Sequence, residues 1–188
     1  VRNLVINGSQ TISSTLPTVR GNFTHLNTNG NTTIAVSGAT FTLVGDYTSP
    51  NLITPLNGFT YDFPWSIGSI TTNTFSLQAN LTLGATRLLS LRYGTLDLNG
   101  YTVSAASIAV GSSGTNAVGL ANTGGGSFTT TMSFTQTAGI FTTYCDVITT
   151  GSYTLTAGTL SLGTKTLTTT AFSSNNANTR AVDFGTGK

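Results

Sequence analysis

GTLDLNGYTVSAASIAVGSSGTNAVGLANTG, at residues 94–124, and GTLSLGTKTLTTTAFSSNNANTRAVDFGTGK, at residues 158–188, align without a gap at an offset of 64 residues. Identical residues occupy the pairs Gly94/Gly158, Thr95/Thr159, Leu96/Leu160, Leu98/Leu162, Thr102/Thr166, Thr115/Thr179, Ala117/Ala181 and Val118/Val182. Apolar character is also kept at Val103/Leu167, Ile108/Phe172 and Leu120/Phe184. An ungapped internal repeat of this kind predicts copies of one structural unit that bury a core by stacking on each other.

Apolar and polar residues alternate within each copy of the repeat. Leu96 and Leu98 flank Asp97, and Val182 and Phe184 flank Asp183. Strict alternation is typical of a β-strand with one buried face. We therefore expect the Leu, Val and Phe side chains to point inward and the two Asp side chains to point outward to solvent.

The composition of the whole chain also favours strands. Charged residues make up 6% of the 188 residues, against about 25% in an ordinary globular domain. Glu is absent, and Ser, Thr, Gly and Asn are abundant. Ser, Thr and Asn are poor helix formers, whereas Thr, Val, Ile, Phe and Tyr pack well on a pleated surface. The composition therefore predicts an all-β protein.

Turn signals recur roughly every 8–12 residues, as in proteins built from many short strands. Segments 75–83, 88–98, 128–144 and 152–162 look like short strands broken by Gly or Asn. The pair Asn99-Gly100 is typical of a tight type I′ hairpin, and it fits equally well as a corner between turns of a solenoid. The fold class that we predict is all-β with stacked β-repeats, arranged as a β-solenoid. A β-sandwich or jelly roll is the alternative.

The chain is expected to have three parts. Residues 1–50 form an N-terminal β region, residues 51–70 a connection rich in Pro and aromatic residues, and residues 71–188 the tandem β-repeat region. Pro cannot donate a hydrogen bond to a central strand ladder, which is why the segment around Pro55 and Pro64 is interpreted as a connection or an edge. Because the first repeat continues into a further strand, we also expect the chain to be part of a longer one.

Three large rings alternate with other residues in the connection, namely Tyr61, Phe63 and Trp65. Rings placed on one side of a connecting segment form either a lid on the end of the core or a binding patch for sugar or protein. These three residues are the candidate binding or end-capping patch.

Catalytic and metal sites find little support in the sequence. Glycoside cleavage needs two carboxylates about 5–9.5 Å apart, and Asp97 with Asp183 is the pair that stacked repeats would bring together. Their partners in the alignment are Ser161 and Gly119, so solvated surface Asp is the favoured interpretation. His25 and Cys145 show no local motif for a nucleophile and its base, and no metal-ligand spacing is present. We therefore predict no enzymatic activity, no catalytic residue, no metal site and no cofactor.

Charge and cysteine usage limit the partners. The net charge is +2 and the basic residues are scattered, which argues against nucleic acid as a partner. No run of 18 apolar residues predicts a membrane span. Cys145 is the single cysteine, and we interpret it as a small buried apolar side chain. A lone thiol in an exterior-type protein fits assembly in a reducing cytoplasm followed by release, as for a virion protein.

GTLDLNGYTV at residues 94–103 and TRAVDFGTG at residues 179–187, with an apolar strand between them, resemble repeats of bacteriophage tail-fibre, spike and capsid-decoration proteins and of related bacterial surface proteins. The resemblance implies a non-catalytic structural or attachment component located on a virion surface. It also implies copies of the same chain as partners, with a homotrimer as one arrangement, together with other virion proteins and a host surface glycan. The alternative is a module of a bacterial extracellular adhesin or filament, located at the cell surface.

Overall fold

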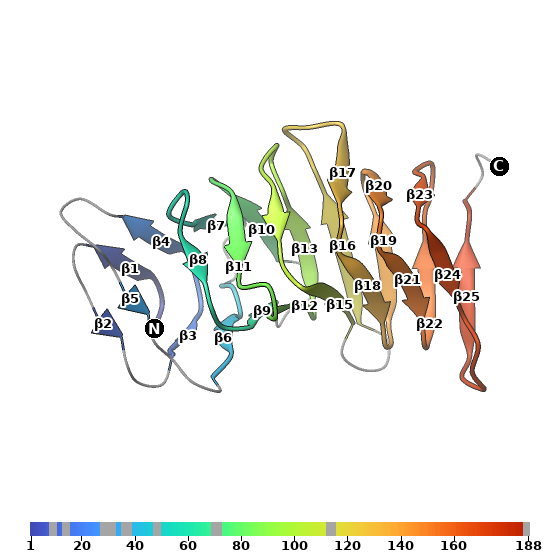
Figure 1. Ribbon diagram of the computed structural model, residues 1–188, viewed down its shortest axis with the longest axis horizontal. Helices are drawn as coiled ribbons and strands as arrows, with labels where there is room; N and C mark the ends of the chain where they lie inside the picture. The colour runs from blue at the N-terminus through green and yellow to red at the C-terminus, as the bar shows by residue number, and fades with distance from the viewer. Residues whose placement is uncertain are drawn as a thin grey trace.

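The protein is a β-solenoid, an elongated stack of parallel strands (Figure 1). The computed structural model describes residues 1–7, 11–12, 16–26, 33–34, 39–46, 50–68, 73–111 and 116–185. Every regular secondary-structure element in these residues is a β-strand, and every pair of neighbouring strands is parallel. Antiparallel pairing, as in a sandwich or a jelly roll, is not seen among them. The predicted β-solenoid is therefore confirmed.

Two long sheets run along the stack. The nine-stranded sheet contains, in spatial order, β1 (Leu4–Asn7), β4 (Phe23–Leu26), β7 (Asn51–Thr54), β10 (Thr74–Leu77), β13 (Gly94–Asp97), β16 (Ala117–Ala121), β19 (Ile140–Thr143), β22 (Gly158–Ser161) and β25 (Arg180–Asp183). The eight-stranded sheet contains, from the N-terminal end, β3 (Thr18–Val19), β6 (Phe41–Leu43), β9 (Trp65–Ile67), β12 (Leu88–Leu91), β15 (Ser107–Val110), β18 (Ser133–Gln136), β21 (Ser152–Leu155) and β24 (Ala171–Ser173).

A third side is formed by three smaller sheets of short strands. They are β2 (Thr11–Ile12) with β5 (Thr33–Ile34); β8 (Thr60–Tyr61), β11 (Leu81–Leu83) and β14 (Val103–Ser104); and β17 (Ser127–Thr130), β20 (Asp146–Thr149) and β23 (Leu167–Thr168). Each turn of the chain thus visits the nine-stranded sheet, the third side and the eight-stranded sheet, in that order.

The corner at Asn99-Gly100 shows how one turn changes direction. Asn99 and Gly100 have φ angles of 50° and 84°, the left-handed region that a type I′ turn needs at both central positions. The Tyr101 amide donates to the Leu98 carbonyl across the turn at 2.8 Å. Because β13 and β14 lie on different sides of the stack, this turn is a corner of the solenoid and not a hairpin.

The internal repeat corresponds to three turns of the solenoid. Its aligned strands are β13 with β22, and β16 with β25, which lie three positions apart in the nine-stranded sheet. The stacking register differs from the alignment by two residues, because Gly94 stacks through Val118 and Phe141 onto Leu160 and not onto Gly158. The repeat therefore predicted correctly which strands belong to the same sheet. It did not predict the strand register, which depends on the different lengths of the connections between strands.

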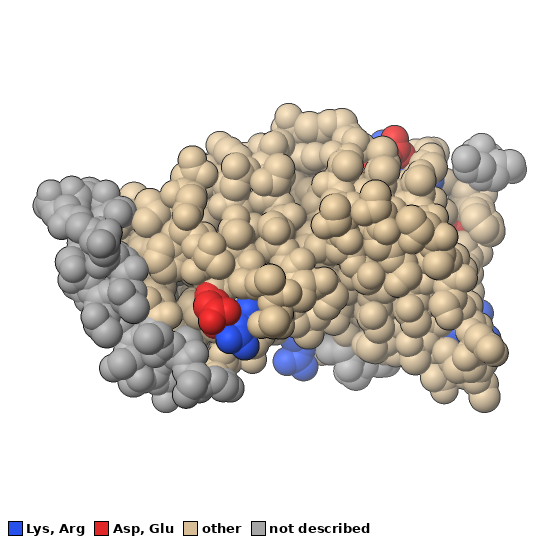
Figure 2. Space-filling view, in the orientation of Figure 1, with Lys and Arg blue, Asp and Glu red and all other residues tan. Residues whose placement is uncertain are grey.

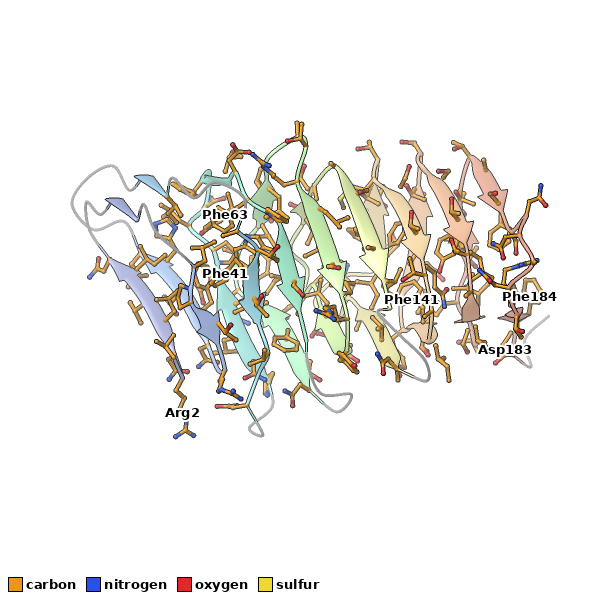
Figure 3. The ribbon with its side chains drawn as sticks, turned by 90° about the horizontal axis from the view of Figure 1, so that it is seen from below. Arg2, Phe41, Phe63, Phe141, Asp183 and Phe184 are labelled. Atoms are coloured by element: carbon orange, nitrogen blue, oxygen red, sulfur yellow. The ribbon has the colours of Figure 1, made fainter. Side chains whose placement is uncertain are left out.

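The core is one continuous apolar column between the three sides (Figure 3). Leu96, Leu98 and Val118 are at most 2% exposed, as their alternation predicted. At the C-terminal end, the side chains that were predicted to point inward are less buried: Val182 is only partly buried and Phe184 is 54% exposed. The reason is that no described strand stacks on the outer side of β25.

Residues 51–70 differ from the predicted connection. They contain the strands β7, β8 and β9, one on each side of the stack. Pro50, Pro55 and Pro64 lie just outside these strands, so a missing N–H costs no ladder hydrogen bond. The N-terminal strands β1, β3, β4 and β6 belong to the same two long sheets as the later strands, so the described residues form one stack.

Candidate functional site

The rings predicted as a binding or end-capping patch lie in the core. Tyr61, Phe63 and Trp65 are 0%, 3% and 0% exposed. Rings of the preceding turn pack on them, with Phe41 4.7 Å and Phe23 5.3 Å from Trp65 between ring centroids. Neither predicted role holds. Alternation around Asp62 and Pro64 points these side chains inward, as it does in the other strands, and β9 lies between β6 and β12 inside the stack and not at an end of the core.

His25, in the middle of β4, belongs to the same buried cluster. Its Nδ1 lies 2.9 Å from the Tyr61 hydroxyl, which accepts a hydrogen bond from the Leu56 amide at 3.0 Å. A neutral imidazole and the Tyr61 hydroxyl thus share one hydrogen bond, whose direction depends on the tautomer of His25. Nε2 has no hydrogen-bond partner among the described residues. Burial lowers the pKa of His25 and raises the pKa of Tyr61, so both groups are neutral structural elements of the core.

Asp97 is not the solvated carboxylate that alternation predicted. It lies on the outer face of β13, yet it is only 8% exposed. Its Oδ1 accepts hydrogen bonds from the Asn99 and Thr123 amides, both at 3.0 Å, and Oδ2 accepts one from the Thr123 hydroxyl at 2.6 Å. The carboxylate thus ties the corner of one turn to the next turn.

Asp183 is exposed as predicted, but it cannot act together with Asp97. The two residues lie on β25 and β13, four strand positions apart in the nine-stranded sheet, which is about 19 Å at the usual strand spacing. Glycoside hydrolysis uses carboxylates about 5–9.5 Å apart. The geometry therefore gives no support to this pair as a catalytic dyad.

Cys145 and the remaining titratable groups likewise form no reactive cluster. Cys145 is 2% exposed, and burial raises the pKa of its thiol, which confirms the prediction of a buried apolar side chain. It follows β19, five strand positions from His25 in the same sheet. In the described part of the chain, no three His, Cys, Asp or Glu side chains group to hold a metal ion. The described residues also contain no helix that is long and apolar enough to cross a membrane.

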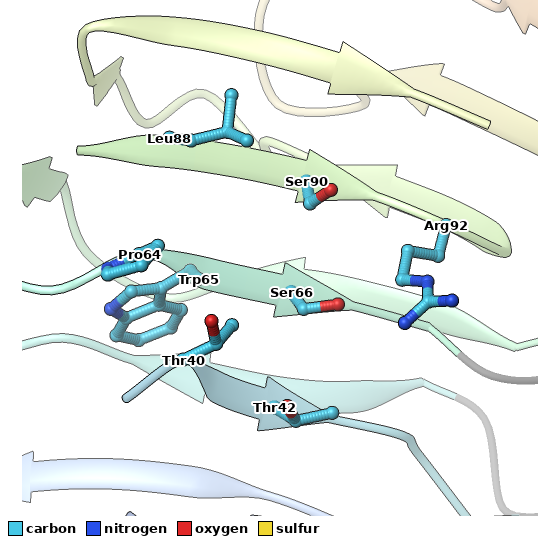
Figure 4. Close-up of a pocket in the computed structure, with 8 residues that line it drawn as sticks. All are labelled: Thr40, Thr42, Pro64, Trp65, Ser66, Leu88, Ser90 and Arg92. Carbon is cyan, nitrogen blue, oxygen red and sulfur yellow. The ribbon is translucent and has the colours of Figure 1, made fainter. Parts of the chain in front are cut away.

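The candidate functional site is a groove on the outer face of the eight-stranded sheet (Figure 4). Its floor is a row of three hydroxyl side chains on adjacent strands: Thr42 on β6, Ser66 on β9 and Ser90 on β12. The three residues are direct register partners, so parallel pairing places their side chains one above the other at the strand spacing of about 4.8 Å.

The two ends of the groove differ in chemistry. Pro64 and Leu88 lie at one end and the Arg92 guanidinium at the other (Figure 4). Thr40 and an edge of Trp65 complete the lining of a space of about 400 Å³. This volume lies within the range of about 300–1,000 Å³ that is usual for small-molecule sites.

Several polar groups in the groove are not satisfied by the protein. The Ser66 hydroxyl is buried, with the residue 5% exposed, and it has no hydrogen-bond partner among the described residues. The Arg92 side chain is exposed and forms no ion pair within that same part of the chain. A buried polar group without a partner is costly and uncommon in native proteins, so the protein's own hydrogen bonding is incomplete at this groove.

The neighbouring cation, Arg87, is already neutralised. Its Nε lies 2.8 Å from Asp62 Oδ1 in an exposed ion pair. The hydrogen bond from Arg87 lowers the pKa of Asp62. Few other charges occupy the face of the molecule seen in Figure 2. Arg92 therefore gives the groove its positive end.

A second, purely apolar hollow lies at the C-terminal end of the core. Phe172 and Phe184 are 46% and 54% exposed there, and they line a space of about 210 Å³ together with Leu160, Leu162, Leu167, Thr169 and Val182. Figure 3 shows Phe184 at this end of the stack, beyond the last strands. The hollow is the uncovered cross-section of the core and carries no convergent polar groups.

Comparison with known proteins found no match from which a function could be transferred to this chain. No family model matches the chain, and neither a curated protein nor a solved structure does.

Proposed function

We propose that the protein is a non-enzymatic structural and attachment component of a virus particle, of the phage tail-fibre, spike or capsid-surface type. The observation that carries the proposal is the elongated stack itself, in which one apolar core runs through all turns. Such a stack grows by adding turns, each of which contacts only its neighbours. It is a scaffold that sets length and stiffness and presents its outer faces.

The outer faces suit a particle surface. The outward positions of the eight-stranded sheet are mostly Ser and Thr, as in the register column Thr18, Thr42, Ser66, Ser90, Ala109, Thr135, Thr154 and Ser173. Short hydroxyl side chains give a flat surface that hydrogen-bonds to neighbouring subunits or to glycans without burying charge. Because charged residues make up only 6% of the chain, contact with a neighbour on such a face buries few charges.

The second candidate is a module of a bacterial extracellular adhesin or filament. One observation favours it: each strand of the two long sheets pairs with strands of its own chain, so a single chain closes the sides of the core without help from a partner. A unit of this kind works as one bead in a longer chain and needs no symmetric assembly.

Native mass separates the two candidates. Light scattering on the purified protein, repeated after mild SDS treatment, is expected to give a trimer or larger assembly that resists the detergent. That result supports a virion component. A clean monomer under both conditions contradicts the virion proposal and favours the adhesin module. Release of reducing ends from host polysaccharide, abolished by Asp→Asn changes, would overturn the non-enzymatic part of both.

A further inference from the structure

We infer that the groove over Thr42, Ser66 and Ser90 binds an acidic saccharide, with the sugar carboxylate on Arg92. The inference rests on the attachment role of the proposed function and names the ligand class for it. It uses only the groove of one chain, so its test does not depend on the oligomeric state.

The acidic group is assigned from Arg92, the cation that lines the groove. Within the described residues the Arg92 guanidinium has no carboxylate partner, whereas Arg87 near the opposite end is held by Asp62. A guanidinium presents parallel N–H donors that match the two oxygens of a carboxylate. An anionic group is therefore drawn to the Arg92 end of the groove and not to the end at Leu88.

The saccharide is assigned from the rest of the lining. Thr42, Ser66 and Ser90 place three hydroxyls in a row across two strand spacings, about 9.6 Å in total, and each hydroxyl can both donate and accept. Sugar hydroxyls can do the same, so they suit Thr42 and Ser90, which are partly buried and lie on either side of Ser66, whose hydroxyl is buried and has no partner among the described residues. Pro64 and Leu88 supply the apolar contact that the C–H face of a sugar ring needs. A purely apolar ligand would offer the Thr42 and Ser90 hydroxyls no hydrogen bond.

The groove is also shaped for a ligand that remains part of a chain. It lies on the outer face of the eight-stranded sheet, where its lining residues come from three adjacent strands and the residues that flank them. The row of small side chains runs along the stack, across the strands, and continues beyond the groove through Ala109 to the hydroxyl of Thr135. A residue within an acidic surface polysaccharide can enter such a groove from the side, with its neighbours following the same sheet face.

The test compares three probes by calorimetric titration: sodium glucuronate, glucose and sodium acetate. Glucuronate is expected to bind weakly, and at least about tenfold more tightly than either glucose or acetate, because a charge-assisted hydrogen bond and the hydroxyl contacts each contribute on this scale. Arg92→Gln is expected to weaken glucuronate binding about tenfold. Ser90→Leu is expected to abolish it by filling the groove.

The matched control is Arg20→Gln, which removes an exposed cation that follows β3, outside the groove. It is expected to bind glucuronate as the unaltered protein does, and unchanged thermal unfolding of all variants shows that they fold. Absence of glucuronate binding, or binding that survives both Arg92→Gln and Ser90→Leu, overturns the inference. Equal binding of acetate overturns the saccharide assignment, and equal binding of glucose overturns the acidic one.

Discussion

The aromatic residues of the core are arranged differently in the two halves of the stack. In the N-terminal half, Phe23, Tyr61 and Trp65 come from three different sides and meet edge to face, with Phe23 at 90° and Tyr61 at 72° to Trp65. In the C-terminal half, Phe134, Tyr153 and Phe172 come from one side and stack nearly parallel, at 17° and 6°. One half has an aromatic cluster and the other an aromatic column.

The column follows from strand register. Phe134, Tyr153 and Phe172 are successive register partners in the eight-stranded sheet, and they are separated by two equal steps of 19 residues along the chain. Turns of equal length repeat the same environment, so each ring lies over the previous one. In the cluster, Phe23, Phe41 and Tyr61 meet Trp65 edge to face, as aromatic pairs prefer, while Phe63 stacks on it. Trp65 at the centre of the cluster is therefore held by more rings than Phe172 at the free end of the column, which contacts Tyr153.

The largest effect that we expect comes from truncating the centre of the cluster. Trp65→Ala removes a ring that is 0% exposed and contacts Phe23, Phe41, Tyr61 and Phe63. The free energy of unfolding should fall by about 3–5 kcal/mol, as for other large-to-small changes in cores. Urea unfolding followed by circular dichroism measures it, since the variant lacks the chain's single Trp.

Phe172→Ala is the comparison at the free end of the column. Phe172 is 46% exposed and stacks on one ring, Tyr153, so its truncation should cost about 1 kcal/mol or less. Equal losses in the two variants would contradict the distinction between cluster and column. A large loss at Phe172 would show that its exposed face is covered in solution.

Alternation and repeats predicted much of this fold, because they act locally. The alternating residues around Asp97 defined the buried face of β13, and the 64-residue offset identified strands that belong to the same sheet. The burial of Asp97 was missed, since its partner Thr123 comes from the next turn. The rings of residues 61–65 were misplaced because Pro was taken to exclude strands, although here the prolines only flank them.

The groove was also missed, although the sequence contains a signal for it. Thr42, Ser66 and Ser90 follow each other at intervals of 24 residues, and so do Thr40, Pro64 and Leu88. This period belongs to the N-terminal half, whereas the repeat that we recognised lies in the C-terminal half. A search for small polar residues at 24-residue spacing would have placed the three hydroxyls in one row. It would not have shown that Asp62 pairs with Arg87, and therefore that Asp62 is not the partner of Arg92.

A smaller effect is expected from a single hydroxyl in the column. The Tyr153 O–H donates to Gln136 Oε1 at 2.7 Å, and Gln136 Nε2 donates to the Thr159 carbonyl at 2.9 Å. Tyr153→Phe keeps the stacked ring and leaves a buried acceptor unpaired, which should cost about 1–3 kcal/mol in urea unfolding. Adding Gln136→Leu removes that acceptor and should recover part of the loss.

Thr154 provides the control, because it neighbours Tyr153 but points outward and is only partly buried. Thr154→Ala should change the free energy of unfolding by less than about 0.5 kcal/mol. A Tyr153→Phe variant as stable as the Thr154→Ala variant would show that the hydrogen bond to Gln136 adds nothing to the column.

A further effect is a dependence of the cluster on pH between about pH 6.5 and pH 5, a range in which no side chain of the column titrates. Burial lowers the pKa of His25 in the folded protein, while the unfolded chain keeps a value of about 6.5. Below that pH the unfolded state binds more protons, so the free energy of unfolding falls as pH drops through this value and levels off below the folded pKa. The slope for one proton cannot exceed about 1.4 kcal/mol per pH unit.

The surroundings of the His25 imidazole explain why the free energy of unfolding falls at low pH through the cluster. Protonation would place a charge on a buried ring that lies 2.9 Å from the Tyr61 hydroxyl through Nδ1 and 4.8 Å from the Phe59 ring between centroids. His25 is the single histidine, and carboxylates titrate near pH 4, so the window between about pH 6.5 and pH 5 belongs to this residue. Urea midpoints at about pH 7.5 and pH 5 should differ in the unaltered protein and coincide in His25→Gln. The same pH dependence in both proteins would mean that a group outside the cluster takes up the proton.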